Sequence, residues 1–159
     1  MGRNSEWIRT YMGNETKVAL WAHNSHVGKA GSWHRSQQGE VLYQNHGDNY
    51  KVIGFSFSKG RFQARSGSGL AVTTDNFLED TDCNTTNTLL QKMDASDYYI
   101  ILDDLPTDSP SYQYFSGKEP FFSLGAVFSP EYARAFSVSL SANFDILIHF
   151  DESTAAIPY

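Results

Sequence analysis

The chain has 159 residues, of which 40% are hydrophobic and 14% aromatic. This composition predicts one folded domain and excludes an intrinsically disordered chain. The formal net charge of −6 hides an asymmetry, since residues 1–74 hold nine Lys or Arg and four Asp or Glu, whereas residues 75–159 hold three and fourteen. The acidic second half argues against binding to nucleic acid or to an anionic membrane surface.

Compartment signals are few. The sequence has no apolar run of about 18 residues, so no membrane-spanning helix is expected. The N-terminal stretch lacks the apolar block of a signal peptide. The single cysteine, Cys83, excludes an intramolecular disulfide and a cysteine-rich zinc site. We therefore expect a cytoplasmic protein.

The first elements are a helix and an apolar strand. Residues 4–12 place apolar side chains on one helical face, with Asn4 or Ser5 as the N-cap. Residues 18–21 are apolar without alternation, which is typical of a strand buried on both faces. Residues 24–38 have the composition of a loop.

Strands and helices alternate in the rest of the chain. A helical turn closed by Gly47 precedes a hairpin expected at residues 52–64, with its turn at Lys59 and Gly60. The later elements are expected as a short strand at 70–74, a helix at 85–93, a strand at 97–102, a strand at 121–128, a helix at 129–136 and a strand at 144–150. This alternation predicts an α/β fold with a mainly parallel sheet flanked by helices.

A cluster of polar residues follows the first predicted strand. His23, Asn24 and His26 stand where such a strand ends, and open α/β sheets bind their ligands at that position. A neutral imidazole can accept a proton from water near pH 7, and a second one can donate to a leaving group or polarise a carbonyl. Asn24 can orient a substrate oxygen or hold a histidine tautomer. The set suits hydrolysis, and surface or capping roles are the alternative.

Other polar groups give weaker signals. Two histidines supply only part of a zinc site, and no spacing indicates that His34 or His46 completes it. Ser25 lacks the G-x-S-x-G elbow of a serine nucleophile. Asp145 and His149 lie on the same face of the last strand, which favours a structural hydrogen bond between them.

Several segments resemble the erythromycin esterase family, whose members are also labelled succinoglycan biosynthesis proteins. KVALWAHNSHVGK at 17–29 is similar to the family's strand and its W-A-H-N-[GS]-H motif, and MGRNSEWI at 1–8 is loosely similar to M-x-x-N-x-x-W-I. GDNYKVIGFSFSKGRFQA at 47–64 resembles G-x-x-Y-x-x-I-G-F-x-F-x-x-G-x-F, and FDILIHFDESTAAIP at 144–158 resembles F-D-x-L-I-H-x-x-x-T-x-A-x-P. The resemblance covers nearly the whole chain in the family's order.

The resemblance implies an incomplete member of the family. Family members are much longer, so residues 1–159 correspond to the C-terminal part of one erythromycin esterase-like domain of the ChaN-like superfamily. The N-terminal part of the family carries a G-E-x-x-H-like segment that supplies a general base, and this sequence has no such segment. The partners expected are the missing N-terminal portion or a second copy of the chain.

The resemblance also implies a reaction. We expect a hydrolase that opens a lactone or another carboxylic ester, such as a macrolide, with histidine-activated water and no cofactor. His23 and His26 are the expected catalytic residues, and Asn24 and Trp21 the expected substrate-binding residues, with no metal ligand. Relatives in the wider superfamily bind metal or haem, which leaves metal binding open. The alternatives are a non-catalytic fragment and a module that binds an apolar or sugar-like ligand.

Overall fold

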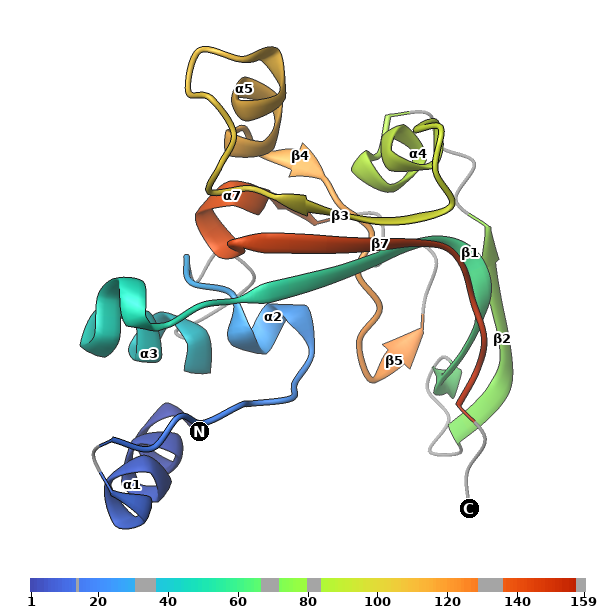
Figure 1. Ribbon diagram of the computed structural model, residues 1–159. Coiled ribbons are helices and arrows are strands. Elements are labelled where there is room, and N and C mark those ends of the chain that lie inside the picture. The colour runs from blue at the N-terminus through green and yellow to red at the C-terminus, as the bar shows by residue number, and fades with distance from the viewer. Residues whose placement is uncertain (14, 31–36, 67–71, 80–83, 129–135, 157–159) are drawn as a thin grey trace.

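The computed structural model describes residues 1–13, 15–30, 37–66, 72–79, 84–128 and 136–156. Within these residues, a five-stranded sheet has the strand order β2-β1-β7-β3, and β5 also pairs with β1 (Figure 1). Its strands are β1 Ile53–Ser66, β2 Val72–Glu79, β3 Asp97–Ile101, β5 Val127–Phe128 and β7 Ile146–Ser153. The two-residue strands β4 Glu119–Pro120 and β6 Ser137–Val138 pair separately.

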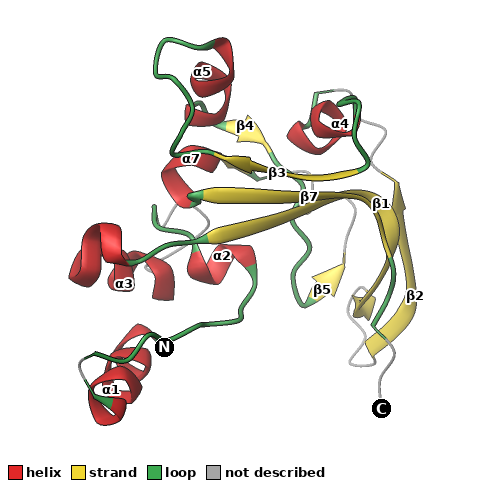
Figure 2. Ribbon diagram, in the orientation of Figure 1, coloured by secondary structure: helices red, strands yellow, loops and turns green. Residues whose placement is uncertain are grey.

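Helices lie on both sides of this sheet. In the view of Figure 2, α1, α2 and α3 lie below β1, while α4 and α5 lie above β3. The helices are α1 Gly2–Met12, α2 Asn24–Val27, α3 Gln38–His46, α4 Thr86–Gln91, α5 Pro110–Ser116 and α7 Leu140–Asn143, with a 3-10 turn η1 at Gly47–Asn49. None of the helices in the described ranges has the length and apolar character needed to cross a membrane.

The strand directions are mixed. β1 runs parallel to β7, with Ile53 opposite Ile146, and parallel to the short β5. It runs antiparallel to β2, and β3 runs antiparallel to β7. The α/β class with flanking helices is therefore confirmed, while the sheet is mixed rather than mainly parallel. The short connection from β1 to β2 accounts for one antiparallel pair, because parallel neighbours need a long crossover.

The predicted strand at residues 18–21 is wrong. These residues are extended but belong to no helix or strand, and they pair with no strand of the described sheet. Val18 and Leu20 are exposed, and the Trp21 side chain is 91% exposed. An apolar run becomes a buried strand only where neighbouring segments cover its faces, and the described residues provide no such cover.

The predicted hairpin turn at Lys59 and Gly60 is also wrong. β1 continues through both residues, and Figure 1 shows that this long strand is bent along its course. Gly60 has a φ of 142°, and a Cβ at this position would lie 2.1 Å from the carbonyl oxygen of Ser153 on β7. The glycine is therefore needed for the close approach of β7 and not for a turn. The strand that folds back on β1 is β2.

Most other predicted elements are confirmed, with shifted ends. The helices expected at 4–12 and 85–93 are α1 and α4, although α1 begins at Gly2 with Met1 as its N-cap. The turn closed by Gly47 is the end of α3, and the strands expected at 97–102 and 144–150 are β3 and β7. The strand expected at 121–128 is reduced to β5, and most of the helix expected at 129–136 lies outside the described residues.

The main core lies between the sheet and the helices. Its most deeply buried members are Leu102, Phe121, Val138, Leu140, Phe144 and Leu147. Phe144 packs directly against β1, because a Cβ on Gly54 would lie 2.8 Å from its ring. Gly54 therefore lets β1 approach the core closely.

Substituting Gly54 with alanine should destabilise the fold. The added methyl group must displace the Phe144 ring, and overpacking of a core costs about 1–3 kcal/mol. We expect this loss in the free energy of unfolding measured by urea denaturation. Gly125→Ala is the matched control, since its Cβ meets nothing within 4 Å. Equal stability of Gly54→Ala and the unmodified chain would contradict the packing argument.

Candidate active site

The predicted histidine pair lies at the first turn of α2. His23 is the N-cap residue, and its Nδ1 accepts a hydrogen bond of 3.2 Å from the backbone N–H of Ser25. The Ser25 hydroxyl lies 2.8 Å from the same nitrogen. The rings of His23 and His26 approach edge to face, with centroids 6.3 Å apart. The structure thus brings the two imidazoles together, as their spacing in the sequence predicts.

Asn24 fastens this turn to β1. Its Nδ2 donates to the carbonyl oxygen of Phe55 at 2.6 Å, and its Oδ1 accepts from the N–H of Phe55 at 3.1 Å. The buried amide satisfies both backbone groups of one strand residue, much as a neighbouring strand does. Asn24 therefore fixes the position of the flanking histidines. Its expected contact with substrate stays a prediction, and its amide is already engaged with β1.

The other edge of His23 faces the segment after β4. Its Nε2 lies 3.2 Å from the Oγ of Ser123. Burial lowers the pKa of His23 below 6.5; a hydrogen bond with the backbone of Leu124 opposes this shift, and the nearby charge of His26 reinforces it. His23 is therefore mainly neutral at pH 7.

His26 and Trp21 are more accessible than His23. The Nδ1 of the exposed His26 lies 3.3 Å from the amide oxygen Oε1 of Gln37. The indole of Trp21 packs on the ring of Phe55, with centroids 5.5 Å apart. Its exposed face is available to a ligand, and the expected binding role of Trp21 stays a prediction.

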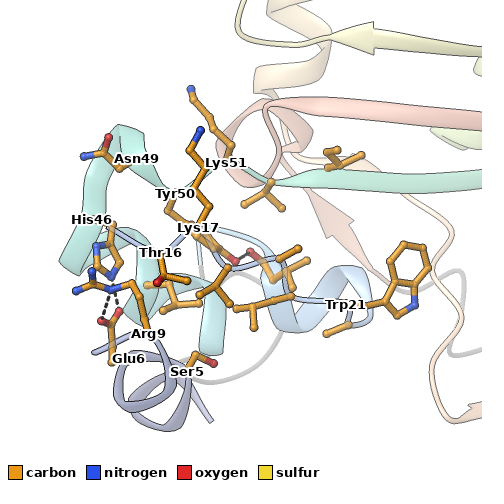
Figure 3. Close-up of a pocket in the computed structure, with 18 of the residues that line it drawn as sticks. Ser5, Glu6, Arg9, Thr16, Lys17, Trp21, His46, Asn49, Tyr50 and Lys51 are labelled. Carbon is orange, nitrogen blue, oxygen red and sulfur yellow. Dashed lines mark hydrogen bonds and ion pairs between the residues drawn. The ribbon is translucent and has the colours of Figure 1, made fainter. Parts of the chain in front are cut away.

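A cavity of about 810 Å³ is lined in part by residues that adjoin the histidine pair in the chain, namely Trp21, Ala22 and Val27. Figure 3 shows part of its lining. The extended residues 17–22 form one wall, and residues 49–53 with Phe55 contribute to another. Trp21 belongs to the lining, whereas His23 and His26 do not. The cavity is therefore separate from the histidine pair, and Trp21 is the predicted site residue that lines it.

A charged group at one end of this cavity was missed by sequence reasoning. Glu6 on α1 is hydrogen-bonded through Oε1 to the Nε2 of His46 on α3, and the Nε of Arg9 lies 3.6 Å from its Oε2 (Figure 3). No local signal links Glu6 to His46, because the packing of α1 on α3 brings them together. The group ties α1 to the rest of the fold.

Asp145 is not a partner of His149. Its Oδ1 accepts hydrogen bonds from the Nζ of Lys29 at 2.6 Å and of Lys51 at 2.9 Å, and its Oδ2 accepts from the N–H of Val52 at 2.6 Å. Burial alone would raise the pKa of Asp145, but these hydrogen bonds outweigh it and lower the pKa to about 2. The expected pairing of Asp145 with His149 is therefore wrong.

His149 has a structural role with other partners. It is fully buried, with Nδ1 2.8 Å from the Oγ of Ser56 and Nε2 3.2 Å from the Oγ of Ser58. Burial lowers the pKa of His149, and the charges of Asp151 and Asp97 oppose that shift. The neutral ring links β7 to β1 inside the sheet.

Among the described residues, no group of three or more His, Cys, Asp and Glu side chains is arranged to hold a metal ion. His34, which was considered as a ligand, lies outside those residues.

Comparison with known proteins gives the family. The model of the erythromycin esterase family matches residues 1–153, so the chain belongs to this family. No curated protein shows a significant match.

Solved structures share the fold. They include a Bacillus cereus protein (TM-score 0.84, 22% identity), a succinoglycan biosynthesis protein (0.79, 25%) and a mutant of the erythromycin esterase EreC in its open conformation (0.63, 13%). The matches cover 97%, 97% and 98% of this chain but 37% of each of those chains. The chain thus spans little more than a third of the length of these structures.

Replacing Asp145 with asparagine should strongly destabilise the fold. The change leaves the ammonium group of Lys29, whose side chain is 10% exposed, without its counter-charge, and breaking a buried ion pair costs about 3–5 kcal/mol. Urea unfolding at pH 7 measures the loss. Glu152→Gln is the control, because Glu152 is an exposed residue 3.8 Å from Lys59 and such pairs contribute about 0–1 kcal/mol. Similar losses in the two variants would contradict the assignment.

The stability of the fold should decrease as the pH falls below 6.5. The pKa of His149 is lowered from 6.5 in the folded chain, so the unfolded chain binds protons first as the pH decreases. His149→Gln should flatten this dependence, while the contribution from His23 remains. The test compares the free energies of unfolding of His149→Gln and of the unmodified chain at several pH values from about 5 to 7.5. A profile that is the same in both proteins would show that His149 does not contribute.

Proposed function

We propose that this chain forms the histidine-bearing wall of an esterase-like hydrolase that cleaves a lactone or another carboxylic ester. The observation that carries the proposal is the His23–His26 pair, held with ring centroids 6.3 Å apart and fixed to β1 through Asn24. Membership of the erythromycin esterase family supports the reaction class. A macrolide lactone is one candidate substrate, and the cytoplasm is the proposed location.

The proposed reaction uses water as the nucleophile. Its oxygen attacks the acyl carbon, the bond from this carbon to the alcohol oxygen breaks, and a carboxylic acid and an alcohol are released. Neutral imidazoles suit this reaction, because they can take up and return a proton near pH 7. The lowered pKa of His23 supports a neutral ring at this pH. The exposed face of Trp21 supports a role in holding an apolar part of the substrate.

We also propose that a companion polypeptide, as a segment of the same chain or as a separate one, provides the opposite wall of the cleft. It corresponds to the part of the family chain that these 159 residues do not span, since they cover 37% of the solved structures. Further support comes from the extended residues 17–22, whose side chains Val18, Leu20 and Trp21 are exposed beside the cavity. A second copy of this chain is the alternative companion.

The hydrolase proposal predicts that activity depends on both histidines. We expect His23→Ala and His26→Ala each to lower kcat/KM by about 10²–10⁴-fold, the usual contribution of a positioned acid or base. Activity is measured with a chromogenic carboxylic ester and with a macrolide lactone, on the chain alone and with the companion polypeptide. Glu152→Gln, which alters an exposed charge on β7, is the control.

Two outcomes would change the proposal. Hydrolysis that persists in both alanine variants would place the chemistry elsewhere. Binding of the macrolide without turnover, by the chain and by its complex with the companion, would favour a ligand-binding module. Trp21→Ala should weaken that binding if the indole contacts the ligand.

A further inference from the structure

We propose that residues 17–22 become a β-strand when the companion polypeptide binds, and that the companion contributes the strand that pairs with them. The inference rests on the proposed function, which includes a companion, and it names the structure that the companion presents to this segment. It follows from the backbone hydrogen bonds, the exposure and the side-chain chemistry of these six residues.

The backbone of residues 17–22 is unpaired. None of their N–H and C=O groups is hydrogen-bonded to another residue that the structure describes, and the segment pairs with no strand of the described sheet. Both flanks are held, since the N–H of Thr16 donates to Gly13 and the carbonyl oxygen of His23 accepts from the N–H of His26. The six residues include no proline, so they offer a continuous row of donors and acceptors.

The side chains of the segment are apolar and exposed. Each of residues 17–22 is exposed, and the five residues after Lys17 are Val, Ala, Leu, Trp and Ala. A strand with one solvated face alternates apolar and polar residues, whereas a strand that is covered on both faces is continuously apolar. The segment therefore has the composition of an interior strand, and the described residues leave it without a neighbour.

Covering this segment requires partners for its backbone as well as for its side chains. Water satisfies the N–H and C=O groups while they are exposed. A helix or a small apolar ligand that covered the side chains would remove this water without replacing its hydrogen bonds, and buried backbone groups without partners are costly. A second strand provides these bonds along the whole segment, as in β-strand addition. The partner surface is therefore an extended strand edge.

The cavity next to the segment has room for side chains of an added strand. All of residues 17–22 contribute to its lining. Leu42, Val52 and Ile53 are among the apolar residues that line it together with this segment. A strand that pairs with residues 17–22 can thus direct apolar side chains into a space that already has an apolar lining.

A second copy of the chain fits this segment less well than a larger companion. Two copies that pair their own residues 17–22 form a two-stranded ribbon, and both apolar faces of that ribbon stay exposed. Such a ribbon is marginally stable at best without further cover. The chain covers 37% of the length of its solved relatives, so a companion that corresponds to the rest is large enough to add a strand and to cover both faces.

Pairing of this segment also bears on the histidine pair. Residues 17–22 lead directly into His23, the N-cap of α2, and Asn24 holds the same turn to β1. Once the added strand is in place, the turn is held from two directions. One link runs through Asn24 to β1, and the other runs through residues 17–22 to the companion.

Amide hydrogen exchange measured by NMR tests the strand directly. The samples are the 159-residue chain alone and the same chain preceded, in one joined polypeptide, by the part of the Bacillus cereus protein that it does not cover. We expect fast exchange at residues 17–22 in the chain alone and protection of at least alternate amides in the joined polypeptide, because successive N–H groups of a strand face opposite edges. Fast exchange at all six residues in the joined polypeptide would overturn the inference.

Two proline substitutions give a matched test. Val18→Pro and Ala19→Pro each remove one N–H, and one of these two groups faces the added strand. That variant should make the neighbouring amides of the joined polypeptide exchange about tenfold faster, the effect of losing one hydrogen bond. Ala19→Val keeps the N–H and is the control. The melting temperature of the chain alone should not change, since these groups have no partner in it. Unchanged exchange in both proline variants would contradict the pairing.

The outcomes separate this inference from the proposed function. If the joined polypeptide has the protected amides but hydrolyses no ester, the hydrolase proposal fails and the strand stands. If it hydrolyses esters while residues 17–22 exchange fast, the hydrolase proposal stands and the strand fails. Protection in the chain alone that increases with its concentration would assign the pairing to a second copy and would rule out the companion as the partner.

Discussion

The buried carboxylate of Asp145 joins segments that are distant in the sequence. Its oxygens accept hydrogen bonds from Lys29, Lys51 and the N–H of Val52, and its backbone carbonyl accepts from the N–H of Leu102. A buried charge is tolerated only where partners compensate for the water it has lost. Folding must therefore bring four segments together. They are the start of β1, the end of β3, the start of β7 and Lys29. Since Gly28, the residue before Lys29, is the C-cap of α2, this constraint extends to the histidine pair.

Two buried asparagines bind β1 and hold the segments on both sides of His23 in place. Asn24 binds the backbone of Phe55, while Asn87 donates to the carbonyl of Phe57 and accepts from the N–H of Phe122. The first asparagine fixes the turn that carries His23, and the second fixes the segment that leads to Ser123. The two segments that contact His23 are therefore both held by the same strand.

The sequence predicts the local features of this protein better than the distant ones. The spacing of His23 and His26 is enough to bring their rings together, because one turn of chain separates them. The partners of Asp145 and the link between Glu6 and His46 could not be predicted from the sequence, because they depend on how separate elements pack. The turn expected at Gly60 failed for a related reason: the glycine is required by the approach of β7 and not by its neighbours in sequence. The buried strand predicted at residues 18–21 failed because burial requires a covering segment as well as apolar side chains.

The exposed residues 18–21 connect the cavity to the histidine pair. They lead directly into His23, and Trp21 packs on Phe55, the residue that holds Asn24. A polypeptide or ligand that covers Trp21 therefore lies next to Phe55, the residue that positions Asn24 and the histidine pair. Residues 18–21 and the turn that carries the histidine pair are thus linked through Phe55, which contacts both Trp21 and Asn24.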